Sequence, residues 1–175
     1  LYFMLGGMKF IQKKYDEAIP YYEQCLSLNS ESASAYNGLA AIYIIKEDLV
    51  QAEKNVNQAL GLNPRLSNVY FNLAQIREKQ GKNLEAVEAY QKELQFSPKH
   101  FRACFNLSRL FRLLGQEEQE LEYLKKTIEI NPNFPLSYFY LARIYLHRGQ
   151  NYEEAISLVK KGIDLKPEKD DLPLG

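Results

Sequence analysis

The sequence predicts an all-α protein built from five tandem helix-turn-helix units. The first observation is a fixed period: leucines recur every 34 residues, at Leu5, Leu39, Leu73, Leu107 and Leu141. The second is that apolar residues within each period follow helical spacing in two successive segments. The third is that turn-forming residues, often glycine or proline, interrupt this spacing at the same two places in most periods. Such a period indicates stacked units rather than one central core.

Other residue types also recur at nearly the same 34-residue spacing. Small residues follow each of the leucines: Gly6, Ala40, Ala74, Ser108 and Ala142. Alanines recur in the second half of four units: Ala18, Ala52, Ala86 and Ala155. Small residues are expected where paired helices cross most closely, because a larger side chain would push the axes apart. Glu120 replaces the alanine in the fourth unit. We expect it either to loosen the fourth helix pair or to extend its side chain toward Arg109 or Arg112.

Each unit is expected to hold two helices joined by a tight turn. In residues 67–100, helical spacing runs from 68 to 79, stops at Gly81, resumes at 84 and ends at Ser97-Pro98. Glycine is the usual residue just past a helix end, and proline disfavours helix in the residue before it. The corresponding breaks elsewhere are Glu47-Asp48 with Asn63-Pro64, Gly115 with Asn131-Pro132, and Gly149 with Lys166-Pro167.

The period therefore divides the chain into units 1–32, 33–66, 67–100, 101–134 and 135–169, with 170–175 as a tail or the start of a following segment. The last unit carries one extra residue in its turn, near Gln150-Asn151. Since no further polar helix caps the array, we expect a fragment of a longer protein with an exposed apolar end. The candidate contacts there are Ile163, Leu165, Leu172 and Leu174.

This pattern resembles the tetratricopeptide repeat (TPR) over about residues 1–168. The matching features are Tyr-x-x-Leu-Ala at 36–40 and 70–74, Tyr-Asp-Glu-Ala at 15–18, and the closing Asn-Pro. The resemblance implies a right-handed superhelical solenoid whose first helices line a concave groove. It also implies a non-catalytic scaffold for protein–protein interaction that holds an extended peptide in that groove.

Composition narrows the function classes. The chain has 175 residues, 46% apolar and 25% charged, with 22 basic against 22 acidic residues. Nucleic-acid binders usually carry a basic excess, so the balance disfavours a nucleic-acid partner. No apolar run approaches the roughly 18 residues of a membrane span. The two cysteines lie in distant units and suit a reducing compartment, which favours a cytoplasmic location.

Motifs for catalysis or cofactors are not found in the sequence. Gly81-Lys82 lacks the rest of a phosphate-binding loop, and the spacing of histidines and cysteines fits no zinc site. His100 and Cys104 are four residues apart, as in a thiol–imidazole pair, but Cys104 falls on a packing column. We therefore expect neither an enzyme nor a bound cofactor or metal.

The register of the first helices predicts which side chains face a peptide. A phenylalanine column recurs at Phe71, Phe105 and Phe139, and rings of this kind are common binding anchors. Asparagine amides follow at two of these positions and could bond a peptide backbone. The candidate binding residues are Phe71, Asn72, Gln75, Arg102, Phe105, Asn106, Arg109, Phe139 and Arg143. The alternative is that the Phe-Asn pairs reflect helix packing alone.

Charge is unevenly distributed along the sequence. Five of the seven arginines lie in two first helices, and residues 101–115 carry three arginines and no acid. Residues 116–130 carry five glutamates against two lysines. The expected partner is a protein or peptide, and the arginines leave two interpretations open. The partner is acidic with apolar anchors, or the arginines simply pair with neighbouring glutamates.

Three other functions remain open at this point. The chain could be the substrate-recruiting arm of a larger enzyme whose catalytic domain lies elsewhere. It could self-associate as a structural array through its uncapped ends. It could also bind RNA, although the basic charge of RNA-reading repeats is not apparent here.

Overall fold

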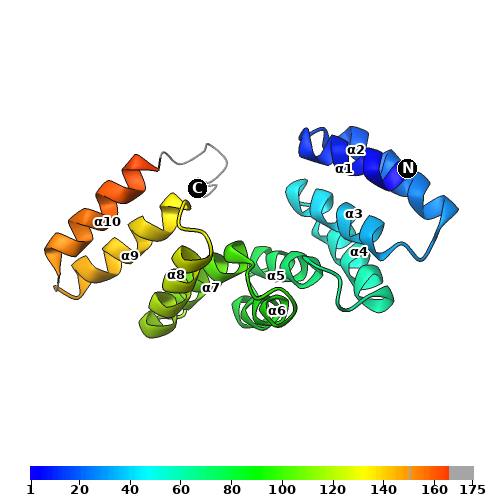
Figure 1. Ribbon diagram of the computed structural model, residues 1–175. Helices are drawn as coiled ribbons and strands as arrows, with labels where there is room; N and C mark the ends of the chain where they lie inside the picture. The colour runs from blue at the N-terminus through cyan, green and yellow to red at the C-terminus, as the bar shows by residue number, and fades with distance from the viewer. Residues whose placement is uncertain (150, 166–175) are drawn as a thin grey trace. The chain divides into compact units, whose positions relative to one another are not determined.

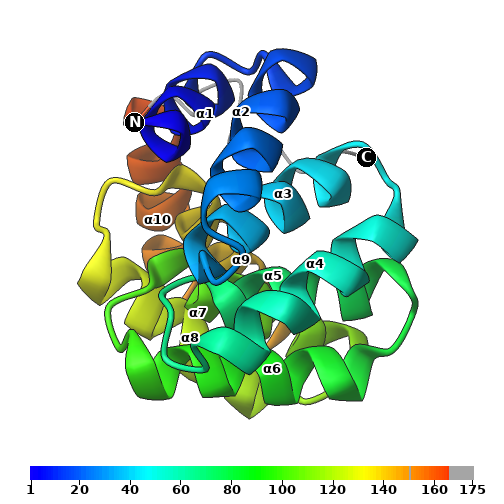
Figure 2. The same ribbon diagram turned by 90° about the vertical axis from the view of Figure 1, so that its right-hand side faces the viewer.

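The computed structural model describes residues 1–149 and 151–165, and every regular element in these residues is a helix (Figure 1). The ten described helices pair into five consecutive hairpins, which confirms the predicted all-α array. Figures 1 and 2 both show the two helices of each hairpin side by side. The end of the fifth predicted unit and the tail at 170–175 lie outside the described residues.

The chain divides into two compact units after Ser97. The first unit holds three hairpins: α1 (Tyr2–Ile11) with α2 (Tyr15–Leu28), α3 (Ala33–Ile45) with α4 (Leu49–Leu62), and α5 (Val69–Lys79) with α6 (Asn83–Phe96). The second unit holds two hairpins: α7 (Phe101–Leu113) with α8 (Glu117–Ile130), and α9 (Pro135–His147) with α10 (Tyr152–Asp164). None of the described helices is long and apolar enough to cross a membrane.

The turn of every hairpin uses a left-handed residue at the same place in the period. These residues are Lys13, Glu47, Gly81, Gly115 and Gly149, with φ between 60° and 74°. Glycine adopts this conformation at little cost, whereas a side chain strains it. Lys13 and Glu47 therefore carry the turn with a residue type that the conformation disfavours.

Asparagine shapes three of the four connections between consecutive described hairpins. The side chains of Asn29, Asn63 and Asn131 each accept a hydrogen bond from the backbone N–H two residues later, at 3.0 to 3.1 Å. This local bond stabilises a turn that competes with continued helix. It ends the second helix and directs the chain into the next first helix.

The helices of each hairpin meet at the small side chains. Ala18, Ala52, Ala86 and Ala155 are at most 1% exposed, as are Ala40, Ala74, Ser108 and Ala142. Aromatic rings fill the space beside them. The ring of Tyr22, for example, lies between Gly6 of α1 and Gly38 of α3.

Neighbouring hairpins within the first unit are joined by apolar contacts and ion pairs. Helix α3 packs on α2, and α5 packs on α4. Asp16 pairs with Lys46 across the first of these junctions, while Arg77 bonds to Glu53 across the second. The Asp16–Lys46 pair is exposed and contributes little, roughly 0–1 kcal/mol, whereas Arg77 and Glu53 are partly buried. Apolar clusters span both junctions.

Helix α5 obtains its N-terminal cap from another helix. Its N-cap residue Asn68 has a left-handed backbone and no side-chain cap bond. Instead, the buried carboxylate of Glu93 in α6 accepts hydrogen bonds from the backbone N–H groups of Asn68 and Phe71, at 2.9 and 3.3 Å. A carboxylate at a helix N-terminus also interacts favourably with the helix dipole.

Substituting Gly38 with alanine is expected to destabilise the first unit. An added Cβ would lie 2.7 Å from the Tyr22 ring, so the ring or the α3 backbone must shift. We expect Gly38→Ala to lower the free energy of unfolding by about 1–3 kcal/mol, as overpacking does. Gly61→Ala is the matched control, because nothing lies within 4 Å of its added Cβ. It should stabilise α4 by up to about 1 kcal/mol in urea denaturation; equal effects at both sites would contradict the packing argument.

Candidate functional site

The three candidate binding residues of the first unit, Phe71, Asn72 and Gln75, all lie on α5, but only Phe71 and Gln75 have exposed side-chain surface. Phe71 and Gln75 are half-buried, and the Phe71 ring packs on Tyr90 of α6 with centroids 5.5 Å apart. Phe71 therefore joins the two helices of its own hairpin as well as forming part of the surface.

Asn72 is buried and engaged by the neighbouring repeat. Its amide donates to the side-chain oxygen of Asn37 at 2.8 Å, and the Asn37 amide donates to the carbonyl of Ser67 at 3.5 Å. The amide chain joins α3 to the start of α5. The packing interpretation of this asparagine thus has direct support, and Asn72 offers little of its side chain to a peptide.

The second unit gives its two phenylalanines different environments. Phe105 of α7 is only 6% exposed and lies edge-on to Phe134 and Tyr140, with centroids 4.9 and 5.2 Å apart. It cannot act as an exposed anchor, because neighbouring rings cover it. Phe139 of α9 is half-buried and packs against Gly162, where an added Cβ would lie 2.7 Å from its ring.

Arginines gather on α7 beside α9, and we call this set the arginine surface. Its members are Arg102, Asn106, Arg109 and Arg112 of α7 with Tyr140 and Arg143 of α9. Arg102, Asn106 and Arg109 are spaced four and three residues apart and so share one helix face. The Phe105–Tyr140 contact places α9 next to that face.

Three guanidinium groups of the arginine surface have no carboxylate partner among the described residues of the second unit. Arg102 lies over the Phe101 ring at 5.7 Å, and Arg112 over the Tyr140 ring at 4.9 Å. Arg109 is half-buried. Helix α7 contains no acidic residue, so its charge is not balanced locally.

Glu120 pairs with Arg143 rather than with Arg109 or Arg112, which corrects the expectation from the sequence. Its carboxylate is 2% exposed and accepts a hydrogen bond from Nη2 of Arg143 at 2.5 Å. The bond connects α8 to α9 and partly neutralises Arg143, one of the predicted binding residues. Arg148 is neutralised more fully, because it bonds to both Glu117 and Glu118 at 2.7 Å. Its hydrogen bond lowers the pKa of the Glu117 carboxyl.

The His100 and Cys104 side chains do not form an activated nucleophile. The imidazole Nδ1 of His100 accepts a hydrogen bond from the backbone N–H of Ala103 at 3.1 Å and so caps α7. Burial raises the pKa of the Cys104 thiol to about 11, so the thiol stays protonated near neutral pH. A protonated buried thiol is a poor nucleophile.

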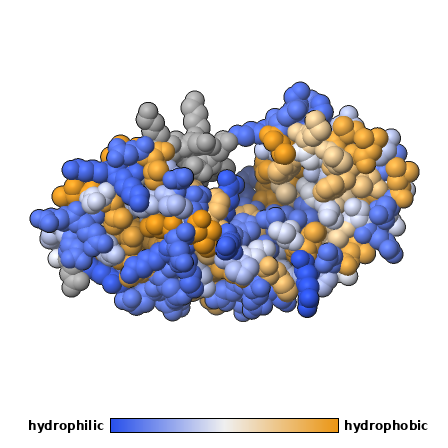
Figure 3. All heavy atoms as spheres, in the orientation of Figure 1, coloured by the Kyte–Doolittle hydropathy of each residue, from blue (hydrophilic) through white to orange (hydrophobic). Residues whose placement is uncertain are grey.

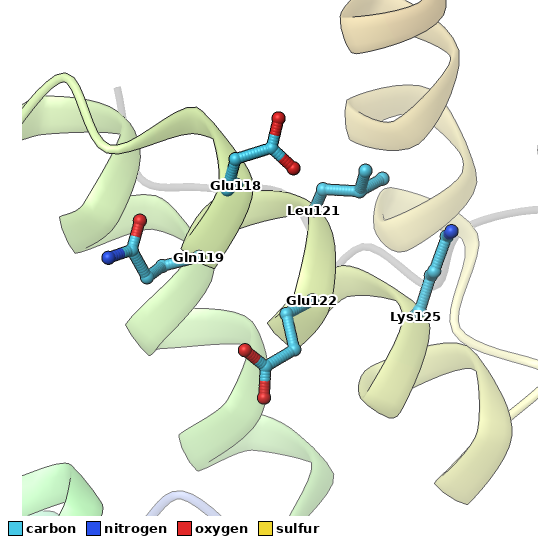
Figure 4. A pocket seen from close by; sticks show the side chains of 5 residues that line it. All are labelled: Glu118, Gln119, Leu121, Glu122 and Lys125. Carbon is cyan, nitrogen blue, oxygen red and sulfur yellow. The ribbon is translucent and has the colours of Figure 1, made fainter.

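A shallow hollow on α8 shows no convergence of chemical groups. It is lined by Glu118, Gln119, Leu121, Glu122 and Lys125, all from one helix (Figure 4). Figure 4 shows these side chains pointing in different directions rather than toward a common point. The described residues also contain no group of three or more His, Cys, Asp or Glu placed to hold a metal ion.

Sequence comparison matches the tetratricopeptide repeat across most of the chain. Models described by that name match residues 9–76, 67–100, 101–134 and 123–157, which together span 9–157. No curated protein is similar enough to the chain to count as a relative.

Solved structures resemble the whole chain at low sequence identity. A pilF structure from Pseudomonas aeruginosa is 20% identical, with a TM-score of 0.87 over 95% of this chain and 76% of that one. MamA is 20% identical, with a TM-score of 0.76 over 92% of this chain and 94% of that one. YrrB, described as a TPR protein with an unusual peptide-binding site, is 20% identical, with a TM-score of 0.69 over 97% and 87%. At this identity the likeness shows the fold alone.

The two partners of the buried ion pair should respond unequally to substitution. Arg143→Ala leaves the Glu120 carboxylate buried without its cation, and we expect a loss of about 3 kcal/mol in the free energy of unfolding. Glu120→Ala leaves an arginine side chain that is 44% exposed and can be hydrated, so its cost should stay below about 1 kcal/mol or become a gain. Urea denaturation of both variants measures the difference, and a harmless Arg143→Ala would contradict this account.

Cys104 should react with thiol reagents much more slowly than Cys25. Cys25 is half-buried, whereas Cys104 is buried with a raised pKa. We expect native protein at pH 8 to be labelled first at Cys25, with Cys104 labelled only as fast as the fold opens. Mass spectrometry of the Cys25→Ser and Cys104→Ser variants separates the two rates. Equal rates in the native protein would show that α7 is not closed around its thiol.

Proposed function

The chain belongs to the tetratricopeptide repeat family, and from this we propose that it is a non-catalytic scaffold that holds an extended segment of a partner protein against its first helices. The observation that carries the proposal is the arginine surface of α7 and α9, where three guanidinium groups lack a carboxylate partner among the described residues of the second unit. Placing unpaired cations together on a folded surface favours a ligand that supplies the missing charge.

The chemistry of this surface favours an acidic peptide. Arginine donates paired hydrogen bonds in a planar fork that matches a carboxylate. Arg102 and Arg109 are seven residues apart on α7, about 10 Å along a helix axis. In a polyproline II segment three residues rise about 9 Å and complete one turn, so side chains three residues apart point to the same side. A segment with acidic side chains three residues apart could therefore reach both.

Apolar contacts supplement the charge. The rings of Phe139 and Tyr140 are half-buried and present part of their surface beside Arg143. Aromatic rings give a large contact area at little loss of side-chain freedom. Asn106 lies between Arg102 and Arg109 on α7, where its amide could bond a peptide backbone.

Phe105 and Asn72, which the sequence predicted to contact a peptide, have structural roles in this proposal. Phe105 supports the arginine surface from beneath, since its ring is covered by Phe134 and Tyr140. Asn72 holds α5 to α3 through Asn37. Phe71 and Gln75 of α5 remain proposed contacts of the first unit because both keep exposed area.

Charge removal at Arg109 tests the proposal. The probe is a fluorescein-labelled twelve-residue peptide with glutamate at every third position, compared with the same peptide carrying glutamine. We expect Arg109→Gln to weaken binding of the acidic peptide at least roughly tenfold, the size of one charge-assisted hydrogen bond. Fluorescence anisotropy at two salt concentrations measures the change.

Arg65→Gln is the matched control, since it removes an exposed arginine of the first unit that lies outside the proposed site. It should leave the affinity unchanged. If the glutamine peptide binds as tightly as the acidic one, the proposed preference for an acidic partner is wrong, although the protein would still bind peptides. Tighter binding of single-stranded RNA than of any peptide, lost in Arg109→Gln, would replace the proposal with nucleic-acid recognition.

A further inference from the structure

The ring of Tyr22 extends from α2 into the space between α1 and α3. An added Cβ would lie 3.0 Å from its carbon atoms at Gly6 of α1 and 2.7 Å from them at Gly38 of α3, so glycine at both positions makes room for the ring. The hydroxyl oxygen at the end of the ring lies 3.8 Å from an added Cβ at Gly7. Gly7 stands two 34-residue periods before Gln75, which is half-buried on α5. The hydroxyl therefore reaches the surface formed by the neighbouring helices α1, α3 and α5.

This hydroxyl has no hydrogen-bond partner among the described residues. Those residues contain no buried side-chain oxygen or nitrogen without a partner, so the hydroxyl keeps contact with solvent although Tyr22 as a whole is only 4% exposed. Tyr90 holds the same position in the third hairpin, and its hydroxyl donates to the carboxylate of Glu78 at 2.5 Å. Phe10 occupies the place of Glu78 in the first hairpin, so Tyr22 lacks this acceptor. An unpaired polar group at a nearly buried position is a candidate for ligand binding.

Small residues surround the Tyr22 hydroxyl, and we call the set of Gly7, Gly38 and Ala41 the notch. All three are half-buried, and Gly38 and Ala41 are three residues apart on one face of α3. The third, fourth and fifth hairpins carry larger residues at the equivalent positions: Gln75, Arg109 and Arg143, and Asn72, Asn106 and Tyr140. Residues without large side chains let another backbone approach closely. The first unit therefore opens where the other hairpins carry side chains.

The surroundings of the notch are apolar. Phe3 of α1 is 41% exposed, and its ring centroid lies 5.8 Å from that of Tyr22. Figure 3 shows apolar surface over the part of the first unit where α1 and α2 lie. The side chain of Asn37 on α3 is already bonded to Asn72 and to the carbonyl of Ser67. The Tyr22 hydroxyl is thus a polar group with an unused bond in a largely apolar setting.

We propose that the notch binds the main chain of an extended segment of a partner protein, and that the Tyr22 hydroxyl donates a hydrogen bond to one of its carbonyl oxygens. This inference rests on the proposed function and names the group that holds the segment on the first unit. The notch contains no charged residue, so a neutral backbone amide avoids the cost of burying a charge. A main-chain bond does not depend on the partner's side chains. The notch accordingly accepts many sequences, whereas the arginine surface selects acidic ones.

Removal of the hydroxyl tests this inference in the full chain. The probe is a fluorescein-labelled twelve-residue peptide with amidated C-terminus, leucine at every third position and glutamine elsewhere, so that no side chain is charged. We expect Tyr22→Phe to weaken its binding about threefold to tenfold in fluorescence anisotropy, the size of one neutral hydrogen bond. Gly7→Gln should weaken binding at least as much, because its side chain covers the hydroxyl. The fold tolerates it, since an added Cβ at Gly7 lies at the ordinary contact distance of 3.8 Å.

Two control variants separate this inference from the proposed function. Tyr21→Phe removes a hydroxyl from the next residue of α2, which lines a different hollow with Glu17 and Gln24, and it should bind the neutral probe like the unaltered protein. Arg109→Gln should also leave this binding unchanged, although it weakens binding of the acidic peptide. Undiminished binding by Tyr22→Phe overturns the inference. So does an unaltered protein that does not bind the neutral probe, or an equal loss in Arg109→Gln and Tyr22→Phe.

Thermal unfolding checks that the Tyr22 hydroxyl is unused within the fold. Tyr22→Phe should unfold at the same temperature as the unaltered protein. Tyr90→Phe should unfold at a lower one, because it removes the bond to Glu78. A lower unfolding temperature for Tyr22→Phe would show that its hydroxyl is bonded inside the protein, and would overturn the inference.

Discussion

Close approach of two helices through small side chains is the constraint on which every hairpin depends. Alanine at the crossing point lets the axes come together, and the space on either side is then filled by a ring from the partner helix. Tyr22 fills this space against Gly6 and Gly38, and Phe139 fills it against Gly162. Packing at this density leaves little room for change, so the aromatic and glycine positions depend on one another.

Glu120 shows how the array accommodates an exception to this constraint. A carboxylate occupies the position where other repeats have alanine, and it is buried because Arg143 of the next hairpin reaches it. The pair links α8 to α9 more specifically than apolar contact would. It also partly neutralises Arg143, whereas Arg102 and Arg109 have no carboxylate partner among the described residues of the second unit. Internal packing thus decides which arginines of the surface remain available.

Periodicity placed the candidate residues on their helices, but it did not predict which of their side chains are buried. The sequence alone shows three arginines and no acidic residue in α7, so the positive charge of this helix is not balanced within it. Phe105 and Asn72 were placed on the correct helices, yet both are buried. Their neighbours Phe134, Tyr140 and Asn37 come from other parts of the period. Spacing within one helix says which side chains share a face, but it does not say what covers that face.

The sequence by itself determined the fold class, the number of hairpins and the turns near Glu47, Gly81, Gly115 and Gly149. These depend on local causes that recur every 34 residues: helical spacing, a left-handed turn residue such as Gly81, and the Asn-Pro that ends a hairpin. Only the tertiary structure decided that Glu120 bonds to Arg143, that Glu93 caps α5 and that Phe105 lies under other rings. Those contacts join residues 22 to 35 positions apart, whose meeting depends on how the helices pack.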